Sequence, residues 1–371
     1  MLRAVRWSVP VVFLAAAALP AQPPAAPAYK IVAADHQTID VKITQTVQTT
    51  NYVVTRWVAF VPEPPELPGQ AVTQVTVSPK AVAVTEVGPL ARKLRLVDSP
   101  VAAPAAGAKM SVELGVKATL RSRKLVALAD GEAAPKVAPL TAAEARYYTS
   151  PGPTVDFDHA AVKAWVERKK LKLGKGEDPV ALATRALDAL REDFNYSYSR
   201  GRNKASEAVV EPTSDGAGLS YLFVAAMRAN KVPARPLCGR LALARKAGSK
   251  PGEFEHDWYH VRAEFHLAGV GWVPVNPGAS VLTAGPVRDL IGNDAGDFLA
   301  LHADVDVRLA FPNRPRVAPT LSVGAAIDAF GRGPFDAVNL PSGWEFTATP
   351  AVGPASSRPR SARPDATGAT E

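Results

Sequence analysis

The chain contains very little cysteine. Cys238 is the only cysteine among 371 residues. An internal disulfide is therefore excluded, and so is a zinc site built from several cysteines. The stability of the chain must come from its core. The hydrophobic share of 47% and the charged share of 21% are ordinary for a globular protein of this kind.

Long hydrophobic runs are also missing. The apolar run at residues 11–19 is too short for an ordinary membrane span, and no later stretch reaches that length. Arg3 and Arg6 precede this run, and Ala26-Pro-Ala28 fits a cleavage site. We expect a signal peptide over residues 1–28, a mature chain without a transmembrane segment, and a periplasmic or extracellular location. An uncleaved anchor is the alternative.

No nucleic-acid-binding motif accompanies the basic charge. The net charge is +8, but the basic residues are scattered, and the densest runs lie at residues 121–124 and 168–172. We therefore predict a solvated basic face and no nucleic-acid partner. Attraction to anionic cell-wall polymers or lipid headgroups is the alternative reading of this charge.

Periodicity divides the chain into regions. Apolar and polar residues largely alternate at residues 39–47, and strand-like segments follow at 52–61, 72–77, 81–87, 94–97 and 110–120. They predict an antiparallel, sandwich-like β-domain over residues 29–130, with a proline/alanine loop at 100–108. The remaining expected regions are a connector at 131–157, a second domain at 158–310, a C-terminal extension at 311–350 and a disordered tail at 351–371.

The second domain changes from strand to helix period. Helices are predicted at residues 158–170, 178–194 and 216–230, and Asp178-Pro179 is typical of a helix start. Strands are predicted at 236–242, 258–267, 271–275, 293–301 and 305–309. The fold class is α+β, with a β-domain followed by a helix-plus-antiparallel-sheet domain.

Three blocks in this domain resemble the core of the transglutaminase-like superfamily, which has a papain-like fold. They are Met227-Arg-Ala-Asn-Lys-Val-Pro-Ala-Arg235 followed by Gly239-Arg240, then His260-Val-Arg-Ala-Glu-Phe265, then Gly271-Trp-Val-Pro-Val-Asn276. The resemblance covers about residues 178–305. It implies a cysteine at a helix start, a histidine base and an aspartate that orients the imidazole.

In this chain the resemblance places Gly216, His260 and Asn276 at those three positions. Glycine has no side chain and cannot attack a carbonyl. Asparagine can hold an imidazole by a hydrogen bond but supplies no charge to stabilise imidazolium. The expected protein is therefore a catalytically inactive member of the family.

Other groups near these positions are candidate substitutes for the missing nucleophile. Thr213 and Ser214 precede the position of the missing nucleophile, and Cys238 lies in an apolar run typical of a buried residue. A metal site would use His256, Asp257 and His260, with His266 on the same face if the strand is regular, but no HExxH spacing is present. No metal and no cofactor are predicted.

The remaining candidates for the cleft are Asp215, Tyr221, Trp272 and the pair His256 and Asp257, with core packing preferred for Trp272. Three functions follow from this reading. The first is a binding module for a peptide, a protein or a cell-envelope polymer. The second is an active hydrolase or acyltransferase with a relocated nucleophile. The third is a structural envelope protein.

Overall fold

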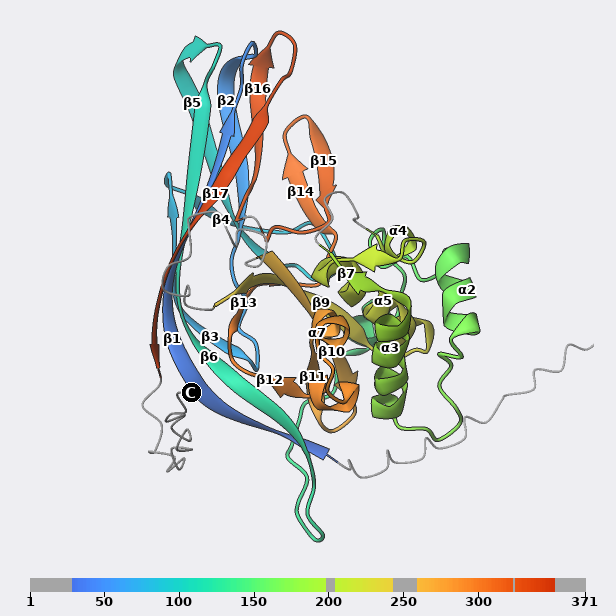
Figure 1. The fold of residues 1–371 in the computed structure, drawn as a ribbon. Coiled ribbons are helices and arrows are strands. Elements are labelled where there is room, and N and C mark those ends of the chain that lie inside the picture. Colours follow the sequence, from blue (N-terminus) through green and yellow to red (C-terminus); the bar gives the residue numbers. More distant parts are fainter. Residues whose placement is uncertain (1–28, 198–203, 243–258, 323, 351–371) are drawn as a thin grey trace, which may run out of the picture.

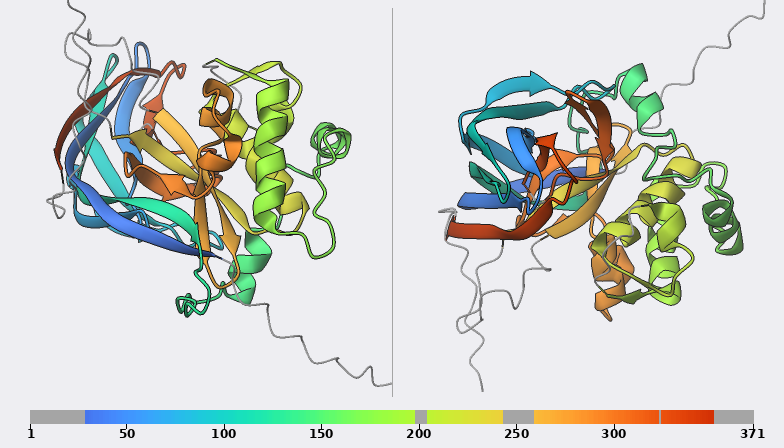
Figure 2. Two further views of the ribbon diagram at one scale, coloured as in Figure 1. Left: turned by 60° about the horizontal axis from the view of Figure 1, so that its bottom comes forward. Right: turned by 90° about the horizontal axis from the view of Figure 1, so that it is seen from above.

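A computed structural model describes residues 29–197, 204–242, 259–322 and 324–350. The fold has three parts, which Figures 1 and 2 show from different sides. A β-rich region lies on one side, a small central sheet lies in the middle, and the helices cover the far face of that sheet. The class is mixed α+β with mostly antiparallel sheets, as the sequence predicted.

The β-rich region consists of two sheets. The first has the order β12-β6-β1-β17, with β3 also paired to β6, and the second has the order β16-β2-β5-β4. Their strands are β1 (Tyr29–Gln48), β2 (Val53–Pro62), β3 (Gln70–Ser78), β4 (Val82–Thr85), β5 (Lys93–Ala105), β6 (Lys109–Ala127), β12 (Asn293–Asp294), β16 (Ala326–Arg332) and β17 (Val338–Pro350). Side chains from both sheets share one core. On β1, alternate residues such as Ile39, Val41 and Ile43 are buried in this core, while Asp40 and Lys42 face solvent.

Two expectations for this region were wrong. The segment 100–108 was expected to be a loop, but β5 continues to Ala105, which pairs with Val54. The C-terminal extension at 311–350 was expected to lie outside the β-domain, and no strands were assigned to it. Instead, β17 lies along β1 from Val338 to Pro350 and β16 lies along β2. These strands are stabilised by pairing with strands from the first hundred residues. The local sequence of a segment does not show which distant strand it will pair with.

The central sheet has the order β11-β10-β9-β13. Its strands are β9 (Ala234–Leu241), β10 (Tyr259–Leu267), β11 (Gly271–Val275) and β13 (Phe298–Ala303), and a separate hairpin is formed by β14 (Val307–Phe311) and β15 (Arg314–Ala318). The helices are α1 (Ala142–Tyr147), α2 (Ala160–Arg168), α3 (Pro179–Asp193), α4 (Ala205–Ala208), α5 (Gly216–Ala229), α7 (Pro277–Leu282) and the 3₁₀ helix η1 (Val287–Leu290). Helix α5 is buried along almost its whole length and packs on β10 and β9, so it is the central helix of this region.

Side-chain caps fix where the helices begin. Asp178 caps α3 with Pro179 in the first turn, as predicted. Asp215 accepts from the backbone of α5, and Asn276 accepts from the backbone of α7. Helix α1 lies in the predicted connector and was missed, although Thr141 and Glu144 form a capping box that is readable in the sequence.

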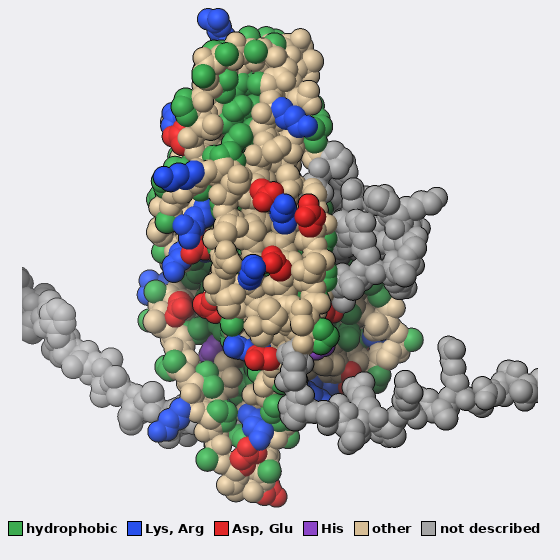
Figure 3. All heavy atoms as spheres, turned by 90° about the vertical axis from the view of Figure 1, so that its left-hand side faces the viewer, with side chains coloured by type: hydrophobic (Ala, Val, Ile, Leu, Met, Phe, Trp, Pro, Cys, Tyr) green, Lys and Arg blue, Asp and Glu red, His purple; other side chains and the backbone are tan. Residues whose placement is uncertain are grey.

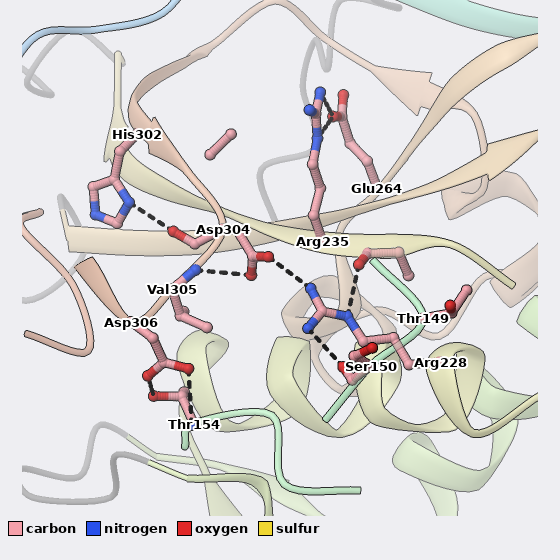
Figure 4. Close-up of polar contacts among 12 residues, drawn as sticks. Thr149, Ser150, Thr154, Arg228, Arg235, Glu264, His302, Asp304, Val305 and Asp306 are labelled. Atoms are coloured by element: carbon pink, nitrogen blue, oxygen red, sulfur yellow. Dashed lines mark hydrogen bonds and ion pairs between the residues drawn. The ribbon is translucent and has the colours of Figure 1, made fainter. Parts of the chain in front are cut away.

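Buried ion pairs connect the parts of the molecule. Arg228, near the end of α5, donates to Asp304 at 2.8 Å, and Arg235 donates to Glu264 at 2.7 Å (Figure 4). Arg123 of β6 reaches the same Glu264 at 2.7 Å, so the β-rich region is bonded to the central sheet through a buried carboxylate. Removing one partner from such a pair leaves an uncompensated charge.

The outer face of the first sheet carries charges of both signs. Lys42 pairs with Glu113, and Lys117 pairs with Asp40; Figure 3 shows basic and acidic side chains lying close together on this face. Within the described ranges, none of the helices combines the length and the apolar character that a bilayer crossing requires.

Candidate functional site

The start of helix α5 forms one side of the site. Strands β7 (Asn195–Tyr196) and β8 (Thr213–Ser214) pair in parallel just before this helix and fix its first residue, Gly216. The Asp215 carboxylate accepts from the backbone N–H groups of Ala217 at 3.0 Å and Gly218 at 2.9 Å. These donors of the first turn are therefore already bonded to an anion.

The imidazole of His260 lies directly against Gly216. A Cβ atom placed on Gly216 would lie 2.7 Å from Cε1 and 2.8 Å from Nδ1 of that ring, and 3.5 Å from the Tyr196 hydroxyl. Gly278 closes the group, because a Cβ there would lie 3.4 Å from the Gly216 Cα and 3.5 Å from His260 Cε1. The ring thus occupies space that any side chain at position 216 would need.

Asn276 holds the other side of the imidazole. Its Oδ1 lies 3.1 Å from His260 Nε2 and also accepts from the Ala279 backbone N–H at 3.3 Å. Because Oδ1 is an acceptor toward both groups, His260 Nε2 carries the proton and Nδ1 presents a lone pair. That lone pair is on the ring edge that faces Gly216. The structure therefore brings together the three positions that the resemblance selected.

The environment keeps this imidazole neutral. Burial, together with the charge of the nearby Arg262 guanidinium, lowers the pKa of His260 to about 4, although the hydrogen bond to Asn276 and the charge of Asp297 act in the opposite direction. At neutral pH the ring is a hydrogen-bonding base without charge. A thiolate beside this ring would therefore not be stabilised by a neighbouring imidazolium.

Two of the suggested substitute nucleophiles, Ser214 and Cys238, point away from the imidazole. Ser214 is fully buried, and its Oγ points toward the body of α5, where a Cβ on Gly218 would come within 2.2 Å of it. Cys238 pairs with Val261, one register position from the pair of Gly239 and His260, so its thiol is on the opposite face of the sheet from the imidazole. Burial raises the pKa of Cys238 to about 12.

The other sequence candidates have varied surroundings. Tyr221 is 2% exposed and belongs to the core under α5. Trp272 lies four residues before Asn276, about 13 Å along the strand, and packs under the Arg235 guanidinium at 3.9 Å. His256 and Asp257 lie outside the described residues. No group of three metal-ligating side chains occurs among the residues that the structure describes.

Tyr196 also lies at the site, although the sequence analysis did not propose it as a site residue. A Cβ atom placed on Gly216 would lie 3.5 Å from the Tyr196 hydroxyl, and one placed on Gly278 would lie 3.3 Å from the Tyr196 ring. The parallel pairing of Tyr196 with Ser214 places it there. A two-residue parallel pairing has no signature in local sequence.

Comparison with known families agrees with this geometry. Residues 167–277 match the profile of the Transglutaminase-like superfamily. The matched segment includes α5, His260 and Asn276, so the chain contains a transglutaminase-like domain. A search of curated protein sequences found no match.

Solved structures with a similar fold exist. The crystal structure of a "Putative Cysteine Protease from Cytophaga hutchinsonii" aligns with a TM-score of 0.53 and 12% identity, over 86% of this chain and 92% of that chain. Two structures of the periplasmic domain of TgpA from Pseudomonas aeruginosa align with TM-scores of 0.31, at 10% and 12% identity. They cover 67% of this chain and 91% and 89% of those chains. The first likeness describes fold alone, and the scores of the other two are too low for an argument.

Proposed function

We propose that this chain is an exported transglutaminase-like protein that has lost catalysis and binds a peptide, a protein or a cell-envelope polymer at the surface beside His260. In this proposal Gly216 occupies the position of the family's nucleophile, while His260 and Asn276 occupy those of the base and the orienting residue. The observation that carries the proposal is that the His260 imidazole occupies the space that a side chain at position 216 would need.

Three further observations support the loss of catalysis. The Asp215 carboxylate already uses the first-turn donors that would otherwise stabilise a thiolate. The lowered pKa of His260 removes the cationic partner. The buried Ser214 and Cys238 do not supply a replacement nucleophile, because neither side chain points to the imidazole.

The proposed organisation is a signal peptide at residues 1–28, a β-domain, a connector and the transglutaminase-like domain. The β-domain begins at residue 29 and is completed by β16 and β17, which come from the proposed C-terminal extension. A ligand bound beside His260 would use the imidazole and the Asn276 amide for hydrogen bonds, since both are uncharged and fixed in orientation.

The test separates binding from chemistry. The mature chain is incubated with glutamine-containing peptides and hydroxylamine, and binding of the same peptides and of purified cell-wall fragments is measured in parallel. We expect no hydroxamate from the parent chain, and binding that is weakened in His260→Ala but retained in the control Asp98→Asn. Product that forms in the parent and disappears in His260→Ala would establish an active enzyme and refute the proposal. Equal binding by the parent and His260→Ala would place the ligand elsewhere.

A further inference from the structure

Strand β16 forms one edge of the second sheet. The sheet has the order β16-β2-β5-β4, and β16 pairs with β2 alone among the described strands. An edge of this kind presents a row of backbone N–H and C=O groups to which another extended chain can pair. The β14–β15 hairpin lies beside this strand (Figure 1) and packs on the same sheet, since the rings of Phe311 and Phe60 are 4.9 Å apart.

The hydrogen bonds of β16 indicate which of its backbone groups face away from β2. The Phe330 carbonyl accepts from the Thr55 hydroxyl of β2 at 3.0 Å, so this carbonyl points toward β2. Backbone groups alternate in direction along an antiparallel strand, so those of Ile327 and Ala329 point outward. In agreement, the Ala329 N–H donates to the Asp328 carboxylate of its own strand at 3.1 Å. The outer edge therefore presents the N–H of Ile327 and the carbonyls of Ile327 and Ala329.

A pocket rich in aromatic side chains lies next to this edge. Its volume is about 290 Å³, and it lies between the hairpin and the turn that joins β16 to β17. The lining residues are Phe311, Asn313, Asp328, Ala329, Phe330 and Phe335. Pockets for drug-sized ligands have volumes of roughly 300–1,000 Å³, so this pocket is suited to one large side chain.

Phe335 is fixed in an exposed position at this pocket. Its side chain is 58% exposed, and the Tyr52 ring packs edge-on against it at 5.3 Å. The next residue, Asp336, accepts from the backbone N–H groups of Thr50 at 3.0 Å and Tyr52 at 3.3 Å, which fixes the turn that carries Phe335. Aromatic side chains are enriched at the contact surfaces of proteins. The ring is therefore placed for contact with a partner.

The charges at the pocket favour an apolar side chain as its occupant. Asp328 and Arg316 pair with each other at 3.5 Å, and the Arg316 guanidinium also lies over the Phe311 ring at 5.3 Å. A charged group from a partner would displace one member of this pair, whereas an apolar side chain would leave the pair intact. The edge and the pocket together therefore define an extended backbone that carries a large apolar side chain.

We propose that β16 binds an extended segment of a partner protein by antiparallel strand addition, with a large apolar side chain of that segment in the pocket. The side chains of Asp328 and Phe330 line the pocket, so the added residue opposite Asp328 points into it as well. The two neighbours of that added residue bond to the backbone of Ile327 and Ala329. This surface lies in the β-rich region and goes beyond the proposed function, because it requires no contact with His260.

The test is a peptide titration of the isotope-labelled mature chain, followed by NMR at pH 7. The probe is an acetylated and amidated peptide with a central phenylalanine and three threonines on each side. We expect it to shift the signals of Phe330 and Phe335 and to slow amide exchange at Ile327. N-methylation of the two threonines next to the phenylalanine should weaken binding by about tenfold or more, because it removes two donors to the edge. N-methylation of the phenylalanine itself should change binding by less than about twofold, because its N–H points away from β16.

Two protein variants test the pocket. Phe335→Ala should weaken binding of the unmethylated peptide by about fivefold, because an aromatic contact is lost. Val82→Ala is the matched control, since Val82 is 56% exposed on β4, the opposite edge strand of the same sheet, and this variant should bind as the parent does. If Phe335→Ala does not fold, the two methylated peptides still test the proposal, because they are measured on the parent chain.

Three results would overturn the proposal. They are the absence of any shift with the unmethylated peptide, equal binding of the two methylated peptides, and protection of the Ile327 amide without peptide in a chain that sedimentation shows to be self-associated. The last result would assign this edge to a second copy of the chain. Shifts at Gly216 and Gly278 would instead report the surface beside His260, so the two proposals can fail independently.

Discussion

Restoring a cysteine at position 216 gives a quantitative test of the site. An added Cβ would lie 2.7 Å from His260 Cε1, closer than real Cβ contacts, so the ring must move. Its movement strains the 3.1 Å bond between Nε2 and Asn276. Overpacking costs about 1–3 kcal/mol, and a lost hydrogen bond costs about 1 kcal/mol. Since the hydrogen bond is strained or lost, we expect Gly216→Cys to lower the free energy of unfolding by about 1–4 kcal/mol.

The same variant tests the electrostatics. The new thiol would lie beside the Asp215 carboxylate and a histidine whose pKa is lowered to about 4, and neither favours a thiolate. We expect its pKa to be at or above the ordinary value of about 8.5. Iodoacetamide labelling at pH 7 should therefore be slow, and adding Asp215→Asn should accelerate it.

The assay uses a Cys238→Ala background, so that position 216 carries the only thiol. Labelling rates are measured by mass spectrometry between pH 5 and pH 10, and stability is measured by urea unfolding with Gly216→Ala as the steric control. Labelling that titrates well below pH 7 would show that a thiolate–imidazolium pair forms. That result, together with unchanged stability, would refute our reading of the site.

Three further predictions follow from the described contacts. Asn276→Asp should raise the pKa of His260 above about 4, because a carboxylate beside the ring favours imidazolium, and NMR titration of the imidazole measures this. Burial also lowers the pKa of His302, to about 3. The unfolded chain then takes up the proton first, so stability should fall as pH drops from about 6.5 toward 3, by up to ~1.4 kcal/mol per unit; urea unfolding should show a shallower acid dependence in His302→Gln. Arg228→Met should cost about 3–5 kcal/mol, because Asp304 is left buried and unpaired, whereas Arg56→Met in an exposed pair should cost less than about 1 kcal/mol in the same urea experiment.

Local sequence was sufficient wherever structure depends on nearby residues. The start of α3 at Pro179 and the start of α5 at Gly216 follow from the caps Asp178 and Asp215, and β11 has the predicted bounds. Caps and alternating burial act within a few residues, so their signals are readable. The resemblance also selected Gly216, His260 and Asn276, which the fold brings together.

Tertiary structure decided what depends on distant partners. β17 forms because β1, some 300 residues earlier, offers a free edge, and Tyr196 reaches Gly216 through its pairing with Ser214. The low pKa of His260 depends on burial and on the position of Arg262. Solvent exclusion and the distances between charges are properties of the packed chain. The sequence was therefore enough to identify the residues of the site, whereas their pKa values and contacts depend on the fold.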